Sequence, residues 1–124
     1  MKYGENDVQK ILFPTDFSDS AMNAAIRFER DNDIKTGELL LLHVIDNETI
    51  EAMTDGYSLI YGDVDTAVDE IEASMRDEAM LKLEKTSEIY RKMLKAEKTT
   101  LLVRIGIPHE QIVKTAEEKR VSVI

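Results

Sequence analysis

The sequence predicts an α/β fold, a three-layer sandwich in which helices cover both faces of a parallel sheet. Short strand-like segments alternate with helix-like segments along the chain. The strand-like segments are continuously apolar, which is typical of strands buried on both faces, and the alternation favours parallel, right-handed crossovers. The length of 124 residues is near the commonest size for one domain. We therefore expect a single domain over residues 1–124.

The first three elements follow from two apolar runs and the turn between them. Residues 10–13 form a short apolar run closed by Pro14, which predicts a buried strand. Ser18 is the expected N-cap of a helix that begins at Asp19 and ends between residues 31 and 33. Residues 38–46 contain four consecutive leucines and predict a second strand, covered on both faces.

The character of the chain changes at residues 47–65. This segment has two glycines, five acidic residues and no lysine or arginine. We expect an acidic, flexible loop there. Its Tyr57 and Tyr61 offer rings that stack on a purine or dock a partner. The alternative, which we favour, is a solvated insertion with neither role.

A long helix is expected over residues 66–98. One apolar stripe runs through this region, and acidic residues precede basic ones along it, as the helix dipole prefers. At 1.5 Å per residue this helix would span about 50 Å, whereas a six-residue strand spans about 20 Å. We therefore expect its first turns to project beyond the sheet or to fray.

The last part of the chain predicts a strand, a helix and the beginning of another strand. Residues 99–105 are strand-like and end in a Gly-Ile-Pro turn. Pro108 is expected to open the next helix, because the first helical position needs no N–H donor. Residues 121–124 predict the start of a fourth strand.

Composition excludes several classes of function. The chain has 16 basic and 25 acidic residues, a net charge of −9, which disfavours binding to nucleic acids or to anionic membranes. It has no cysteine, so disulfides and thiol catalysis are excluded. No apolar run approaches the roughly 18 residues of a membrane span, and the first residues show no signal-peptide pattern. We expect a cytoplasmic protein with no nucleic-acid or membrane partner.

Catalytic and metal-binding motifs are also missing from the sequence. Glycine-rich phosphate loops and serine-hydrolase elbows are absent. A zincin pattern begins at His109 and Glu110 but has Val113 where a second histidine is required. His43 lies inside the leucine-rich strand, where we expect a core histidine with one satisfied nitrogen. Its combination with Ser18 and Asp16 has no recognised triad spacing, so we expect no catalytic residue, no metal site and no enzyme.

Asp16 stands out because of its position. It follows the first predicted strand directly, and parallel α/β sheets bind ligands outside the carboxyl ends of their strands. A carboxylate there accepts hydrogen bonds from an amine or a hydroxyl. The equally weighted alternative is that Asp16 only caps the turn or the first helix.

Three segments in order resemble the universal stress protein family. Lys10-Ile-Leu-Phe-Pro-Thr-Asp16-Phe-Ser18 resembles its opening strand and turn, and Leu39-Leu-Leu-Leu-His43-Val44 resembles its second strand. Gly106-Ile107-Pro108, with the helix that follows, resembles its third strand, turn and helix. The resemblance implies a cytoplasmic, commonly dimeric α/β domain of the adenine nucleotide alpha hydrolase-like type. It also implies a role in stress response or signalling.

The resemblance also implies a nucleotide site. In the ATP-binding branch of the family, the aspartate after the first strand contacts adenine, and backbone at the end of the second strand contacts the base edge. The matching positions are Pro14, Thr15, Asp16 and Val44. An ionised Asp16 accepts from the adenine amino group, and Val44 contributes its main chain. The implied cofactor is ATP or another adenine nucleotide such as AMP, bound without turnover.

The sequence departs from the family pattern after residue 120. The glycine-rich phosphate loop and the fifth strand of the ATP-binding branch do not occur before Ile124. We therefore expect sheet order 3-2-1-4 and an adenine half-site without a phosphate half-site. The alternative function is a protein-interaction or dimerisation module that binds no nucleotide. We also expect a homodimer or higher oligomer, formed through residues 121–124 or through the helices.

Overall fold

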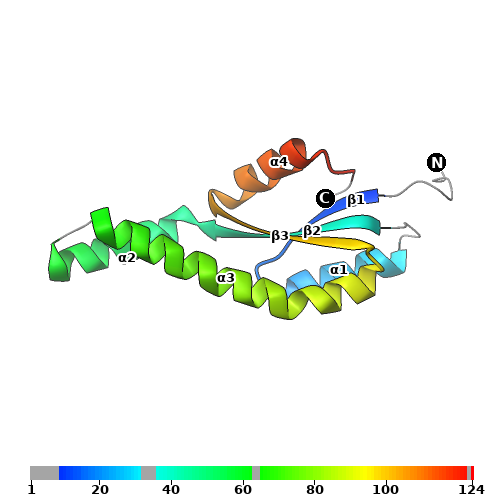
Figure 1. Cartoon of the computed structure of the whole chain (residues 1–124), viewed down its shortest axis with the longest axis horizontal. Helices are drawn as coiled ribbons and strands as arrows, with labels where there is room; N and C mark the ends of the chain where they lie inside the picture. The colour runs from blue at the N-terminus through cyan, green and yellow to red at the C-terminus, as the bar shows by residue number, and fades with distance from the viewer. Residues whose placement is uncertain (1–8, 32–35, 63–64, 123) are drawn as a thin grey trace.

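The structure, a computed structural model, describes residues 9–31, 36–62, 65–122 and 124. Its elements in chain order are β1 (Gln9–Pro14), α1 (Asp19–Asp31), β2 (Thr36–Asp46), α2 (Asn47–Tyr61), α3 (Asp65–Leu94), β3 (Lys98–Gly106) and α4 (Pro108–Lys119). Figure 1 shows the sheet between α4 on one face and α1 and α3 on the other. The predicted three-layer α/β fold is confirmed.

The sheet is parallel, with β2 in its centre and the order β1-β2-β3. Leu39 lies opposite Ile11 of β1 and Thr99 of β3, and this register continues to the end of β1 at Pro14. The first three strands therefore follow the predicted order 3-2-1.

The leucines of β2 explain why its sequence shows no alternation. Leu39 and Leu41 belong to the core under α1 and α3, which also contains Phe13, Leu83 and Tyr90. Leu40 and Leu42 belong to the core on the other face, under α4. All four leucines have at most 1% of their surface exposed. Each layer of helices therefore covers its own pair, and the prediction of a strand buried on both faces is confirmed.

The prediction of a loop at residues 47–65 is wrong, because residues 47–61 form helix α2. The Asp46 carboxylate caps its start by accepting from the Glu48 N–H at 2.9 Å. Gly62 ends it in the left-handed conformation with φ 81°. Ile50 and Thr54, one turn apart, are buried on the side that packs against α3. Residues 63 and 64 lie outside the described part of the chain.

The predicted fourth strand is not formed by the described residues at the end of the chain. Val121 and Ser122 adopt irregular structure, and residue 123 lies outside the description. The Ser122 N–H donates to the Lys10 carbonyl at 2.7 Å. This single backbone bond places Ser122 beside β1, where the fourth strand was expected, but it makes no ladder.

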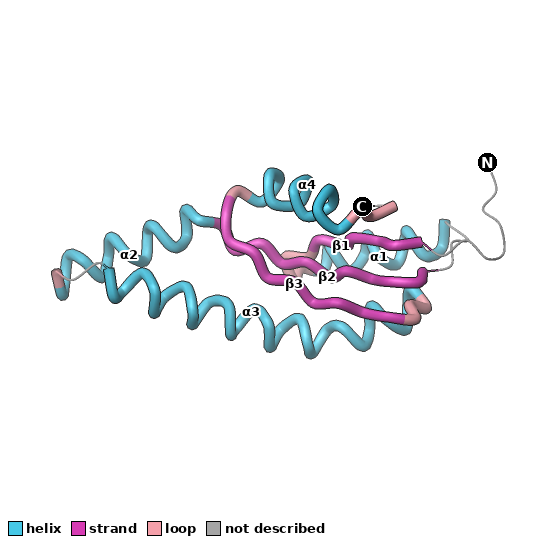
Figure 2. The backbone as a smooth tube through the Cα atoms, turned by 45° about the horizontal axis from the view of Figure 1, so that its top comes forward, coloured by secondary structure: helices cyan, strands magenta, loops and turns pink. Residues whose placement is uncertain are grey.

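Helix α2 and the first part of α3 form a helical hairpin (residues 47–61 and 65–75). Figures 1 and 2 show it extending past the end of the sheet. Its base is anchored by an apolar cluster of Ile45, Ile50 and Ala79, packed on Met75 and Ile105. The expectation that the long helix projects beyond the sheet is therefore confirmed.

Glu38 connects the three strands at their amino ends. Its Oε2 accepts from the Thr100 hydroxyl at 2.7 Å, and its Oε1 lies 3.7 Å from Lys10 Nζ. Lys98 Nζ lies 3.9 Å from Oε2. The Thr100 hydroxyl, helped by the two lysines, lowers the pKa of Glu38 below its ordinary value of 4.5. The ionised carboxylate thus stabilises the folded sheet.

We expect Glu38→Gln to destabilise the chain by about 1 kcal/mol at neutral pH. The pKa is lowered on folding, so this contribution is complete above the unfolded pKa and is lost as the pH falls through the folded pKa. Urea unfolding of the two proteins should therefore converge below about pH 4. Glu84→Gln, on the exposed side of α3, should leave stability unchanged. A difference that persists into acid would contradict this assignment.

Candidate functional site

A cavity of about 520 Å³ lies at the carboxyl ends of β1 and β2, where α1 and α4 begin. This volume is typical of sites for small molecules. All four residues implied by the family resemblance line it. The complete set is Pro14, Thr15, Asp16, Ser18, Ser20, Ala21, Val44, Pro108 and Ile112.

Thr15 fixes the turn that carries the site. It is only 5% exposed, and its N–H donates to the Leu42 carbonyl at 2.8 Å. Its hydroxyl accepts from the Phe17 N–H at 3.0 Å and lies 3.4 Å from the Tyr90 hydroxyl. The side chain of Thr15 is therefore engaged within the protein. Its role is to hold the turn, and sequence reasoning did not separate that role from ligand contact.

His43 fastens the same turn to β2. Its Nδ1 lies 2.8 Å from the Thr15 carbonyl oxygen, which can only accept, so Nδ1 carries the proton. The imidazole packs against the Phe17 ring, with 4.5 Å between centroids. The expectation of one satisfied nitrogen is thus confirmed for Nδ1, but His43 is half-buried and lines a cavity, so it is not a core residue. Ser18 Oγ accepts from the Ala21 N–H at 3.2 Å, so the predicted N-cap is confirmed.

Phe17 occupies a strained position that the sequence did not signal. Its φ is 66°, in the left-handed region that non-glycine residues seldom adopt. The Thr15 hydroxyl and the His43 ring hold it there, and Lys82 Nζ lies 5.6 Å from its ring centroid. Such strain persists only where neighbouring contacts impose it, and it concentrates at functional sites.

Asp16 lies exposed on the rim of the cavity. Its Oδ1 accepts from the Ser18 N–H at 2.9 Å, so Asp16 does stabilise the turn, as one of its two sequence interpretations held. Hydrogen bonds from the Ser18 side chain and backbone lower its pKa below the ordinary 3.8. The carboxylate is therefore ionised at neutral pH. It has about four lone-pair sites, so it can accept from a ligand as well.

Val44 presents its main chain to the cavity. The Leu42 carbonyl accepts from the Thr15 N–H, so the main-chain N–H and C=O of Leu42 are directed toward β1. Val44 lies two residues further along β2, so its main-chain groups are directed toward the same edge. β1 has already ended at Pro14, which lies opposite Leu42. The N–H and C=O of Val44 therefore point beyond the end of β1, and Pro14 and Ile112 give the same cavity apolar walls.

A second cavity of about 320 Å³ lies on the opposite side of Asp16 and Val44. Phe17 and His43 contribute to its wall, and α3 contributes Met75, Glu78 and Lys82, with 3.4 Å between the charged atoms of the last two. Asp16 thus lines both cavities. Among the described residues, no three His, Asp or Glu side chains lie close enough together to hold a metal ion. No helix in that same part of the chain is both long and apolar enough to cross a membrane.

Comparisons with known proteins agree with this architecture. The sequence model of the Universal stress protein family matches residues 7–124. Universal stress protein MJ0577 of Methanocaldococcus jannaschii is 35% identical over 120 residues, which cover 94% of this chain and 74% of that protein. The crystal structure of hypothetical protein PH0823 superposes with a TM-score of 0.74 at 39% identity, over 93% of this chain and 76% of that one. The solved structure of MJ0577 gives a TM-score of 0.66 at 32% identity, over 93% and 71%.

An α/β sandwich with a cavity at the carboxyl ends of its parallel strands defines a class of small α/β domains. Within that class, the match over residues 7–124 and the 35% identical relative identify one family. This chain belongs to the universal stress protein family.

We expect Thr15→Val to destabilise the chain by about 1–2 kcal/mol, because it leaves the Phe17 N–H without its acceptor in a strained turn. Thr49→Val, at an exposed position of α2, is the matched control and should change stability by less than about 0.5 kcal/mol. Urea denaturation measures both. Equal effects of the two substitutions would contradict the role assigned to Thr15.

Proposed function

We propose that this chain binds adenine nucleotides through their base, without turnover, as part of a stress-response or signalling role. One observation carries the proposal: Pro14, Asp16 and the main chain of Val44 meet at one cavity of about 520 Å³ beyond the end of β1. Family membership supports the coarser statement of a universal stress protein-like function.

The chemistry of the cavity suits a flat, polar-edged ring. Pro14, Val44, Pro108 and Ile112 offer apolar walls for the faces of a purine. The ionised Asp16 accepts from the exocyclic amino group, which can only donate. The N–H and C=O of Val44 can pair with a base edge that has both an acceptor and a donor. A base bound in this way would have its polar edge satisfied and its faces buried.

Phosphate groups should add little to the affinity. Among the residues that line the cavity in the described part of the chain, none is lysine or arginine. The start of α1, at Ser20 and Ala21, supplies only the modest positive potential of a helix N-terminus. The net charge of −9 opposes the approach of a triphosphate.

The absence of turnover in this proposal rests on the two candidate bases. Asp16 has a lowered pKa and is therefore a weak proton acceptor at neutral pH. His43 uses Nδ1 to hold Thr15 and lines the other cavity, away from Pro14 and Pro108. We expect ATP incubated with the protein to release phosphate no faster than it does in buffer.

Calorimetric titration with adenosine, AMP and ATP tests the proposal. We expect a dissociation constant on the order of 100 µM for adenosine, and values for AMP and ATP within about tenfold of it. Asp16→Asn retains an oxygen for the Ser18 N–H but removes the charge, so it should weaken adenosine binding about five- to tenfold.

Asp19→Asn is the matched control, since it removes an acidic charge three residues away, from a side chain outside the cavity lining. It should change the affinity less than about twofold. If no adenine compound binds more tightly than about 1 mM, nucleotide binding fails for this chain. The alternative function, a domain that works through protein contacts alone, would then be favoured. Self-association and cytoplasmic location stay predictions.

A further inference from the structure

Helix α2 has a second apolar face, directed away from α3. Ile50 and Thr54 are buried on the inner side, while the outer side carries residues that recur every three or four positions. We call these residues the outer face; they are Thr49, Ala52, Met53, Gly56, Leu59 and Ile60, and all six are exposed. Met53 is 48%, Ile60 74% and Leu59 90% exposed. A helix that is apolar on two sides is normally buried on both.

Gly56 lies at the centre of the outer face and is not required by the fold of the chain itself. A Cβ built on it would meet no atom within 4 Å, and no left-handed φ is found there. Glycine in an exposed helix interior is about 1 kcal/mol less favourable than alanine. With Ala52 one turn earlier, Gly56 leaves a flat strip between Met53 and Ile60. Such a strip allows the backbone of another helix to approach closely.

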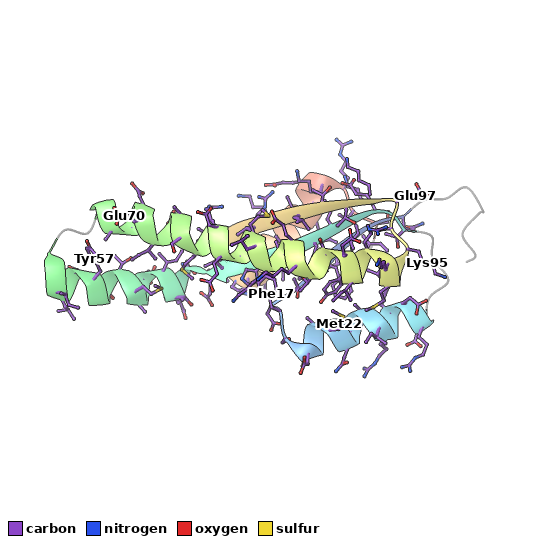
Figure 3. The ribbon with its side chains drawn as sticks, turned by 60° about the horizontal axis from the view of Figure 1, so that its bottom comes forward. Phe17, Met22, Tyr57, Glu70, Lys95 and Glu97 are labelled. Carbon is purple, nitrogen blue, oxygen red and sulfur yellow. The ribbon has the colours of Figure 1, made fainter. Side chains whose placement is uncertain are left out.

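One border of the outer face is strongly acidic. Glu48, Glu51 and Asp55 recur at i, i+3 and i+7 and so form one row along α2. Between residues 47 and 75 the sequence has eight acidic residues and no basic one, so this segment carries eight of the nine net negative charges of the chain. Figure 3 shows Tyr57 of α2 and Glu70 of α3 toward the free end of the hairpin.

Within the part of the chain that the structure describes, these carboxylates have no basic partner: Glu48, Glu51 and Asp55 form no ion pair with lysine or arginine. The negative electrostatic potential of these carboxylates therefore extends into the solvent and attracts positively charged groups to the outer face.

We propose that the outer face of α2 docks an amphipathic helix of a partner protein whose apolar seam is bordered by lysine or arginine. Met53, Leu59 and Ile60 would pack into the seam, Gly56 would permit the close approach, and the acidic row would pair with the basic border. Charge selects this occupant over a second copy of the chain. Two antiparallel α2 helices packed through this face would place their acidic rows on the same side of the interface, where like charges repel.

A synthetic helix tests the proposal directly. The probe is a fluorescein-labelled, 18-residue peptide with leucine at the a and d heptad positions and lysine at most others. Two reference peptides accompany it, one with the same composition in scrambled order and one with glutamate in place of lysine. Fluorescence anisotropy at about 0.1 M salt measures binding to the full chain. We expect the Leu–Lys helix to bind at least tenfold more tightly than either reference peptide.

Variants of α2 separate a shaped surface from simple charge attraction. Gly56→Leu fills the flat strip but meets only open space in the chain, so the protein should fold normally and bind the probe at least tenfold more weakly. Ala73→Leu, at an exposed position of α3, is the matched control and should bind as the unmodified chain does. The double variant Leu59→Ser/Ile60→Ser removes two anchors without changing charge and should also lose at least tenfold. Gly56→Ala should raise the melting temperature by about 3 °C, which confirms that glycine is not needed for folding.

Three results would overturn the proposal. In the first two, the ordered and scrambled Leu–Lys peptides would bind equally well, or the variants Gly56→Leu and Ala73→Leu would bind the probe equally well. Either result would show that net charge alone explains the binding. Sedimentation that shows a dimer of the chain alone, abolished by Gly56→Leu, would assign the outer face to a second copy. None of these results depends on nucleotide binding, since the outer face and the larger cavity, of about 520 Å³, share no residue.

Discussion

The burial of β2 on both faces is the constraint on which the rest of the structure depends. Four leucines in sequence can be removed from water only if one helical layer covers Leu39 and Leu41 and another covers Leu40 and Leu42. At roughly 2 kcal/mol for each fully buried leucine, this strand supplies a large share of the hydrophobic free energy. The same requirement sets the three-layer order and makes β2 central. The two cavities then form at its carboxyl end, because the helices that cover its faces begin or pass there.

The candidate site is rigid although it lies on a turn. Thr15 joins β1 to β2 through its backbone and to α3 through Tyr90, and His43 holds the Thr15 carbonyl from β2. These contacts are needed because Phe17 adopts a backbone conformation that is unfavourable for a bulky residue. The buried residues of the turn thus fix its shape, and the exposed Asp16 is available to a ligand. Thr15 and His43 hold the turn in place, while the neighbouring Asp16 is exposed.

Elements with a strong apolar pattern could be predicted from the sequence. Prediction failed where contacts between distant residues determine the secondary structure. The strands and α1, α3 and α4 were placed to within a few residues, because apolar periodicity, Ser18 and Pro108 mark them clearly. Helix α2 was missed because the five acids and two glycines of residues 47–65 resemble a loop, whereas packing of Ile50 and Thr54 on α3 makes residues 47–61 a helix. The four site residues do lie at one cavity, but Thr15 turns inward. No pattern in one sequence distinguishes a buried threonine that holds a turn from one that faces a ligand.

The unequal lengths of β1 and β2 have a consequence for the size of the larger cavity. β1 ends at Pro14, while β2 continues to Asp46 beside β3, so the sheet has a step at its edge. This step forms one side of the larger cavity, and the size of the step depends on how many residues β2 extends beyond the end of β1. The last bond between the two strands is made by Thr15, whose N–H donates to the Leu42 carbonyl at 2.8 Å, so pairing stops one residue after Pro14. A longer or shorter β1 would therefore change the size of the larger cavity, while the leucines that β2 contributes to the two cores would stay in place.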